Sequence, residues 1–139
     1  MTTGHNITGE SHNEVRLHTI TEKGDDFEIV AIVYELSADC LVILYGGTRP
    51  HIGAVGMGQV RPSLRDAEKG SASSSVFTYV GHKEDMVAKT LAEELTRKLG
   101  RNTVVVAGIH WDALSEKAVQ TITALCKALT GKIVEQLSP

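Results

Sequence analysis

The chain has few aromatic side chains and no run of basic residues. Its 139 residues include one Trp, three Tyr and two Phe, and the formal net charge at pH 7 is −3. Proteins that bind nucleic acids usually carry a basic patch, often with aromatic residues that stack on bases. The sequence therefore gives no reason to expect a nucleic-acid partner.

Long hydrophobic runs are also missing. Tyr, Glu or Gly interrupts each apolar stretch well before the roughly 20 residues that span a bilayer, so no membrane contact is expected. The first 14 residues are polar and lack the apolar segment of a secretory signal. The only two cysteines, Cys40 and Cys126, stand in apolar contexts, which favours two buried, reduced thiols over a disulfide. These features predict a cytoplasmic protein.

The common sequence signatures of catalysis are absent as well. The chain has no G-x-S-x-G elbow, no P-loop, no H-E-x-x-H, and no G-x-G-x-x-G opening a helix. Cys40 is too apolar in its surroundings to be an expected thiolate. No catalytic residue is therefore assigned.

The chain does have apolar strand-like runs and two stretches of helical periodicity. Its length and its 42% of hydrophobic residues fit one globular domain. We expect a flexible N-terminal tail over residues 1–13 and a single α+β domain over residues 14–139. Strands are expected over residues 14–21, 27–34, 40–45, 51–60, 74–80 and 103–109, and helices over residues 83–99 and 113–137.

The order of these elements predicts an α+β fold, a mostly antiparallel sheet with one β-α-β crossover and two helices. The fourth and fifth strands are expected to form a hairpin through a long loop over residues 61–73. The first helix then makes the fifth and sixth strands parallel. Several glycines inside the fourth strand indicate bulges or the close approach of another segment.

Several single residues carry local signals. His18 is expected to face solvent on the first strand. Gly100 occupies the position after a helix end that glycine favours. Asp112, supported by Ser115, is a candidate N-cap of the second helix, and Gly131 is a candidate break or bend within it.

Three short stretches that combine glycine and histidine stand at expected strand ends. They contain His51, His82 and His110. The hairpin and the crossover place all three histidines at one edge of the sheet. Arg49, Lys83 and the N-termini of both helices add positive charge and unpaired N–H groups, so the sequence predicts an anion site for phosphate or carboxylate. The alternatives are a zinc site formed by the three histidines and purely structural roles for these residues.

Several stretches together resemble the LpdD-like prenylated flavin chaperone family, which comprises accessory proteins of gallate-type and related hydroxyarylic acid decarboxylases. These stretches are residues 46–55, 61–64, 73–76, 81–85 and 107–112. The resemblance implies a fold similar to that of proteasome assembly chaperones and a homodimer. It also implies that the chain binds prenylated FMN (or FMN) and assists its delivery to a UbiD-type decarboxylase.

Residues and resemblance together predict a non-catalytic carrier. The expected cofactor-binding residues are Arg49, His51, Gly53, His82, Lys83, His110 and Trp111. Trp111 or Tyr79 is expected to cover the flavin ring. Two alternatives stay open: a small metal-dependent hydrolase using the three histidines, and a structural decarboxylase subunit that binds no cofactor.

Overall fold

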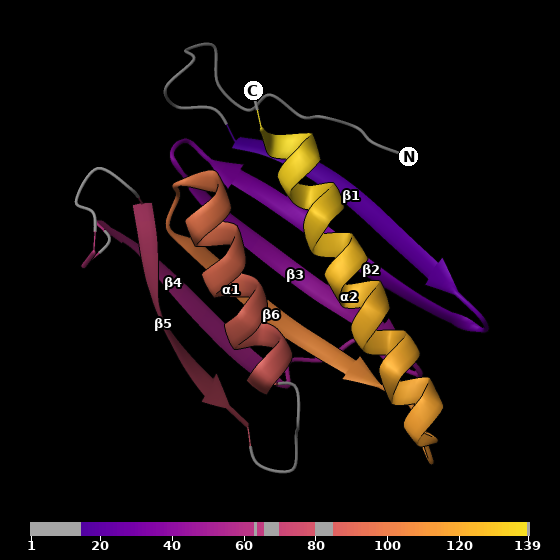
Figure 1. Cartoon of the computed structure of the whole chain (residues 1–139). Helices are drawn as coiled ribbons and strands as arrows, with labels where there is room; N and C mark the ends of the chain where they lie inside the picture. The colour runs from indigo at the N-terminus through magenta and orange to yellow at the C-terminus, as the bar shows by residue number, and fades with distance from the viewer. Residues whose placement is uncertain (1–14, 63, 66–69, 80–84, 139) are drawn as a thin grey trace.

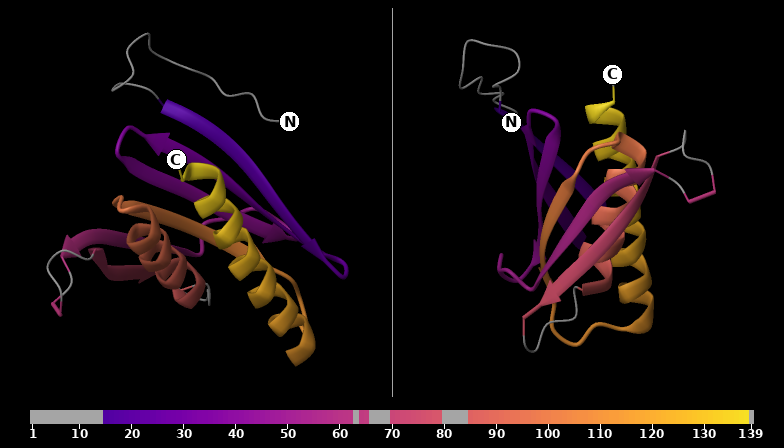
Figure 2. Two further views of the ribbon diagram at one scale, coloured as in Figure 1. Left: turned by 45° about the horizontal axis from the view of Figure 1, so that its top comes forward. Right: turned by 90° about the vertical axis from the view of Figure 1, so that its left-hand side faces the viewer.

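The computed structural model describes residues 15–62, 64–65, 70–79 and 85–138. Within them, two helices cover one face of a six-stranded sheet (Figures 1 and 2). The strands are β1 (Val15–Gly24), β2 (Phe27–Leu36), β3 (Asp39–Gly47), β4 (Ala54–Pro62), β5 (Gly70–Thr78) and β6 (Thr103–His110), and the helices are α1 (Asp85–Leu99) and α2 (Glu116–Leu137). The expected tail over residues 1–13 lies outside the described residues.

The strand order in the sheet is β1-β2-β3-β6-β4-β5. Every neighbouring pair is antiparallel except β3 and β6. The α+β class is therefore confirmed, as are the β4–β5 hairpin and the crossover from β5 through α1 to β6. The sequence did not predict that β6 inserts between β3 and β4 and pairs in parallel with β3.

Several expected strand limits were wrong. The β4–β5 hairpin is longer than predicted, because Arg61 pairs with Ser71 and Pro62 with Gly70 inside the expected loop. The side chains there are mostly polar, so the sequence does not show the alternation of apolar and polar residues that indicates a strand. β4 also begins at Ala54, so His51 precedes the strand instead of opening it.

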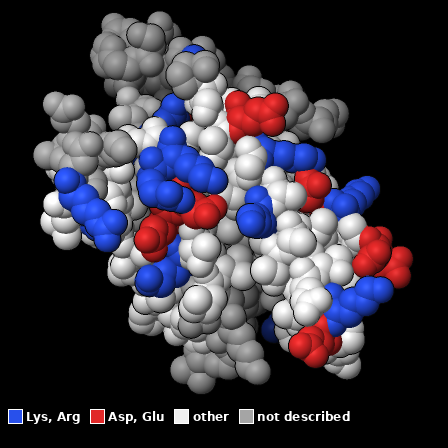
Figure 3. All heavy atoms as spheres, in the orientation of Figure 1, with Lys and Arg blue, Asp and Glu red and all other residues white. Residues whose placement is uncertain are grey.

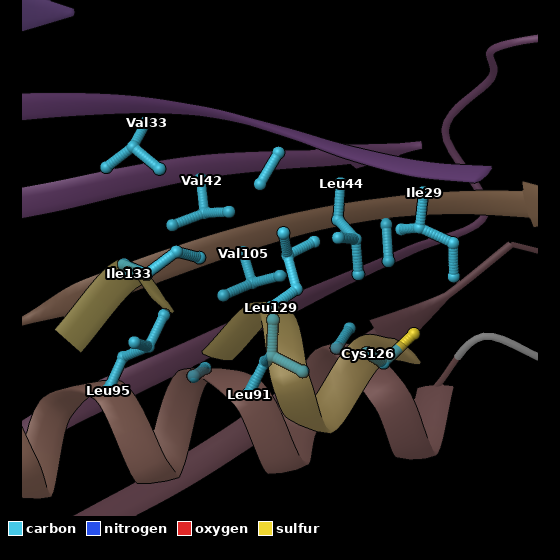
Figure 4. Packing of buried hydrophobic residues seen from close by; sticks show 14 of the residues in the cluster. Ile29, Val33, Val42, Leu44, Leu91, Leu95, Val105, Cys126, Leu129 and Ile133 are labelled. Atoms are coloured by element: carbon cyan, nitrogen blue, oxygen red, sulfur yellow. The ribbon is translucent and has the colours of Figure 1, made fainter. Parts of the chain in front are cut away.

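The core lies between the sheet and the two helices (Figure 4). Alternate residues of the central strands point toward the helices, as the two-residue period of a strand requires. Among the largest buried side chains are Ile29, Val33, Val42, Leu44, Val105, Leu95, Leu129 and Ile133. Burying each of them stabilises the fold by roughly 1.5–3 kcal/mol relative to an exposed position.

The glycines of β4 allow α1 to lie very close to the sheet. A Cβ atom added at Gly56 would lie 2.2 Å from the carbonyl oxygen of Ala88, and one added at Gly58 would lie 2.6 Å from that of Ala92. Real Cβ atoms essentially never show contacts under 3.0 Å. The expected close approach at this strand is thus confirmed, and the approaching segment is α1.

Both helix ends follow local rules. Gly100, at φ +64°, follows α1, and its N–H donates to the Thr96 carbonyl, as predicted. The N-cap of α2 is Ser115, whose hydroxyl accepts from the Ala118 N–H, so the expected cap at Asp112 was wrong. α2 continues through Gly131 to Leu137. Neither described helix is long and apolar enough to cross a membrane.

The expectation that His18 faces solvent was also wrong. Its Nε2 atom lies 2.7 Å from Oε1 of Glu35, and Nη1 of Arg101 lies 2.7 Å from Oε2 of the same carboxylate. All three side chains are largely shielded from solvent. Burial raises the pKa of Glu35, but hydrogen bonds from Arg101 and His18 outweigh it and hold that pKa below its ordinary value. The cluster joins β1, β2 and the segment just before β6.

Candidate functional site

The ends of several strands meet at one edge of the sheet. β3 and β6 are parallel and both end there, whereas β4, antiparallel to β6, begins there (Figure 1). β5 is antiparallel to β4 and therefore also ends at this edge. The predicted common edge is confirmed for these strands.

The chain between β3 and β4 crosses the end of β6. Because β6 lies between those two strands, residues 48–53, which we call the strap, must pass over it. The Thr48 N–H donates to the His110 carbonyl, and the Gly53 N–H donates to the Ala107 carbonyl, both at 2.9 Å. The strap is thereby tied to β6 at both of its ends.

Two glycines make this crossing possible. Gly47 has φ +97°, and a Cβ atom there would lie 1.8 Å from the His110 carbonyl oxygen. A Cβ atom at Gly108 would lie 1.7 Å from the His51 carbonyl oxygen. Both glycines thus admit the close approach of the protein's own backbone.

The strap brings His51 next to His110. Their ring centroids are 6.4 Å apart and their planes are nearly perpendicular. Nδ1 of His51 donates to the Arg49 carbonyl at 3.2 Å, and Nε2 of His110 lies 3.0 Å from Oδ1 of Asp112. The predicted proximity of these two histidines is confirmed, whereas His82 and Lys83 lie outside the described residues.

Arg49 is exposed on the strap, and its guanidinium has no partner among the residues that the structure describes. An unpaired guanidinium can hold a phosphate or carboxylate through two parallel hydrogen bonds. The His110 ring already uses Nε2 toward Asp112, so its Nδ1 donates to an anion only when the ring is protonated. Within the strap, Arg49 is the side chain that is always positively charged.

A search for family relationships agrees with this architecture. The model of the prenylated flavin chaperone LpdD-like domain matches residues 23–138. The chain belongs to this family. It is 24% identical over 119 residues to "Protein LpdD" of Lactiplantibacillus plantarum, an alignment that covers 86% of this chain and 84% of that protein.

The LpdD-like fold also occurs among solved structures. One of them is described as a novel chaperone complex for yeast 20S proteasome assembly, and one of its chains superimposes with a TM-score of 0.55. The match covers 89% of this chain and 98% of that chain at 14% identity. At this level of identity the similarity shows the fold, as the sequence predicted.

The two aromatic residues expected near a flavin lie on opposite faces of the sheet. Trp111 packs on the helix-bearing side, with its ring 5.0 Å from that of Phe27 and beside Gly46. Tyr79 lies two residues after Phe77, so both side chains lie on the other side of the sheet. Their rings are 5.3 Å apart. The two cannot enclose one ring between them, and Tyr79 is the more exposed.

The backbone groups expected at the site are largely occupied. Gly53 donates its N–H to Ala107 and accepts from the Tyr79 N–H, so it offers no amide to a ligand. At the start of α2, the Ser115 hydroxyl already accepts a hydrogen bond from the backbone N–H of Ala118, and Glu116 adds a negative charge. Side chains of the strap are therefore better placed than this helix N-terminus to meet an anion.

Neither cysteine is suited to nucleophilic chemistry. Cys40 and Cys126 are free and buried, as predicted, and burial raises the pKa of each thiol to about 11. A thiol with such a pKa holds very little of the reactive thiolate at neutral pH. Within the described ranges, no three His, Cys, Asp or Glu side chains form a group that could hold a metal ion. The three-histidine alternative includes His82, which is outside those ranges.

A further feature of the structure is the apolar face of the sheet opposite the helices. Met57 and Phe77 are about half exposed there. The available signal was the strand over residues 27–34, which is apolar at nearly every position. That pattern is typical of strands covered on both faces.

Proposed function

We propose that this LpdD-like chain is a non-catalytic carrier that binds prenylated FMN, or FMN, and assists the maturation of a UbiD-type aromatic acid decarboxylase. Membership of a prenylated flavin chaperone family supports the chaperone part of this role. When bound in the decarboxylase, the flavin supplies the chemistry. The residues of this chain only bind and orient it. The two free thiols fit a reducing compartment such as the cytoplasm.

The observation that carries the proposal is the exposed and unpaired guanidinium of Arg49, held on a strap that two glycines keep against β6. Arg49 lies two residues before His51 on the strap, and the His51 ring lies 6.4 Å from the ring of His110. Tyr79 offers an exposed ring beside the same strap, through its N–H bond to Gly53. The residues present thus fit a ligand with an anionic end and a flat aromatic part.

Arg49→Ala in titrations with FMN tests this site. Loss of one charge-assisted contact should raise the Kd roughly ten- to a hundredfold. Riboflavin has the same ring and lacks the phosphate, so its weaker binding should be the same in both proteins. Arg97→Ala removes an exposed arginine from the other end of α1 and should leave both affinities unchanged.

The outcomes separate the alternatives. An unchanged FMN affinity in Arg49→Ala would mean that the phosphate binds elsewhere. If the wild type binds neither FMN nor prenylated FMN but co-purifies with the decarboxylase, it is a structural subunit. If it binds the cofactor but does not increase the activity of the apo-decarboxylase, the delivery role is refuted and the binding role remains.

A further inference from the structure

β5 forms one edge of the sheet, and among the described residues no strand lies on its outer side (Figures 1 and 2). In an antiparallel pair, residues whose N–H and C=O groups bond the partner strand alternate with residues whose groups point away from it. The Tyr79 N–H donates to the Gly53 carbonyl on the β4 side. The Val60 N–H, opposite Ala72, instead donates to Asn102 on the far side of β4. The residues whose backbone groups point outward from β5 are therefore Gly70, Ala72, Ser74, Val76 and Thr78.

The sequence of β5 contains none of the features that usually protect a sheet edge. Its 9 residues, GSASSSVFT, include no charge and no proline. β1, at the opposite edge, carries Arg16, His18 and Lys23. Its Thr21 carbonyl also accepts from Nζ of Lys132 on α2. Charges and occupied backbone groups of this kind hinder the pairing of an edge with another chain, so the sheet has one protected edge and one open edge.

The two faces of the sheet beside β5 differ in polarity. On the helix side, the Ser74 hydroxyl donates to Oε2 of Glu93 on α1, and Nζ of Lys89 lies 3.9 Å from the same atom. Side chains of both charges gather over the helices on this side (Figure 3). On the other side, Phe77 is 60% exposed, and its ring lies 5.3 Å from that of Tyr79. A strand placed beside β5 would meet polar groups on one face and aromatic rings on the other.

We propose that the outer edge of β5 binds an extended segment of a partner protein, which adds a strand to the six-stranded sheet. The inference does not depend on the proposed flavin role. The backbone of the segment bonds the outward N–H and C=O groups of β5, which supply the affinity in this mode of recognition. Its side chains alternate, polar toward α1 and aromatic or β-branched toward Phe77.

A second copy of β5 fits this edge less well than such a segment. Antiparallel pairing of two β5 strands over their full length sets Phe77 opposite Ser71 and Val76 opposite Ala72. Directly opposed side chains stabilise a strand pair most when aromatic or β-branched residues face each other. Two copies would therefore leave each Phe77 ring beside a small polar side chain, whereas a partner segment with an aromatic or β-branched residue at that position covers the ring.

The probe is a synthetic peptide chosen from a displayed library of random peptides by binding to the whole chain. Enriched peptides should alternate polar residues with aromatic or β-branched ones. Ser74→Pro should raise the Kd of the peptide about tenfold, because it removes an outward N–H and places a ring at the edge. Proline is tolerated in an edge strand where the N–H faces solvent, so the variant should fold. The increase should exceed that of Ser74→Ala, which loses the hydroxyl bond to Glu93 but keeps the N–H.

Thr78→Pro and Thr78→Ala are the second pair if Ser74→Pro does not fold by circular dichroism. Amide hydrogen exchange tests the edge in the wild type. Without peptide, the N–H groups of Ala72, Ser74 and Val76 should exchange faster than those of Ser73 and Ser75, and bound peptide should slow them. A library that yields no binder overturns the proposal, and so does a Kd that the folded proline variant leaves unchanged. Slow exchange at the outward groups without peptide, relieved by dilution, overturns it as well and assigns the edge to a second copy.

Discussion

Gly108→Ala should strongly destabilise the protein, because the strap leaves no room for a side chain at this position. The added Cβ atom would lie 1.7 Å from the carbonyl oxygen of His51, and its next neighbours would also be backbone atoms of that residue. The strap would have to move by more than 1 Å to reach an ordinary contact distance. No flexible side chain can yield in its place.

The size of the effect follows from the contacts that this movement disturbs. Forcing an extra methyl group into a packed site costs about 1–3 kcal/mol. The N–H bonds that Thr48 and Gly53 donate to β6 fix the strap at this spot, and weakening both costs about a further 1–3 kcal/mol. A total loss of about 2–6 kcal/mol lowers the melting temperature by about 6–18 °C for a chain of this length.

Gly131→Ala is the control, since it makes the same chemical change at another glycine. A Cβ atom at Gly131 meets nothing within 4 Å, and the residue lies inside α2. Alanine is a better helix former than glycine, so this variant should gain about 0.5–1 kcal/mol. Urea and thermal denaturation at one fixed protein concentration measure both changes. A Gly108→Ala protein that melts within about 2 °C of the wild type would contradict the crossing described here.

Two further predictions concern buried ionisable groups. Cys40 and Cys126 should not react with a thiol reagent at pH 8 in the folded protein and should both react in denaturant, because burial raises each pKa to about 11; rapid labelling of native protein would refute their burial. Glu35 has a pKa that is lower in the folded chain than in the unfolded chain, because of Arg101 and His18. Its stabilisation is complete above the unfolded value of about 4.3 and is lost as the pH falls through the folded value. At pH 7 the free energy of unfolding of Glu35→Gln should therefore be about 1–3 kcal/mol lower than that of the wild type. Below about pH 4.3 it should fall less steeply with pH than that of the wild type, as denaturant titrations across this range would show. Equal slopes of the two free energies against pH in this acid range would contradict the prediction.

The sequence predicted the elements well because their signals are local. Hairpin turns, the apolar periodicity of α2 and the glycine after α1 depend on a few neighbouring residues. The pairing of β3 with β6 depends on residues about 60 positions apart, and nothing local marks it. The strap is a consequence of that pairing, and so it could not be foreseen either. The predicted approach of His51 to His110 was correct because it required only that their strand ends lie together. The strap that brings His51 to this place was not predicted.

The glycines were the least specific evidence for a ligand site at these strand ends. The sequence shows that Gly47 and Gly108 stand a few residues before His51 and His110. A ligand or another segment of the chain can explain such glycines equally well. The structure decides between these explanations, since backbone carbonyls of His110 and His51 occupy the two positions that Cβ atoms would take. These glycines let the strap lie against β6, and Arg49 is the charged side chain that the strap presents to solvent. Substitution at Gly108 should therefore lower stability first, whereas substitution at Arg49 should change anion binding in a protein that still folds.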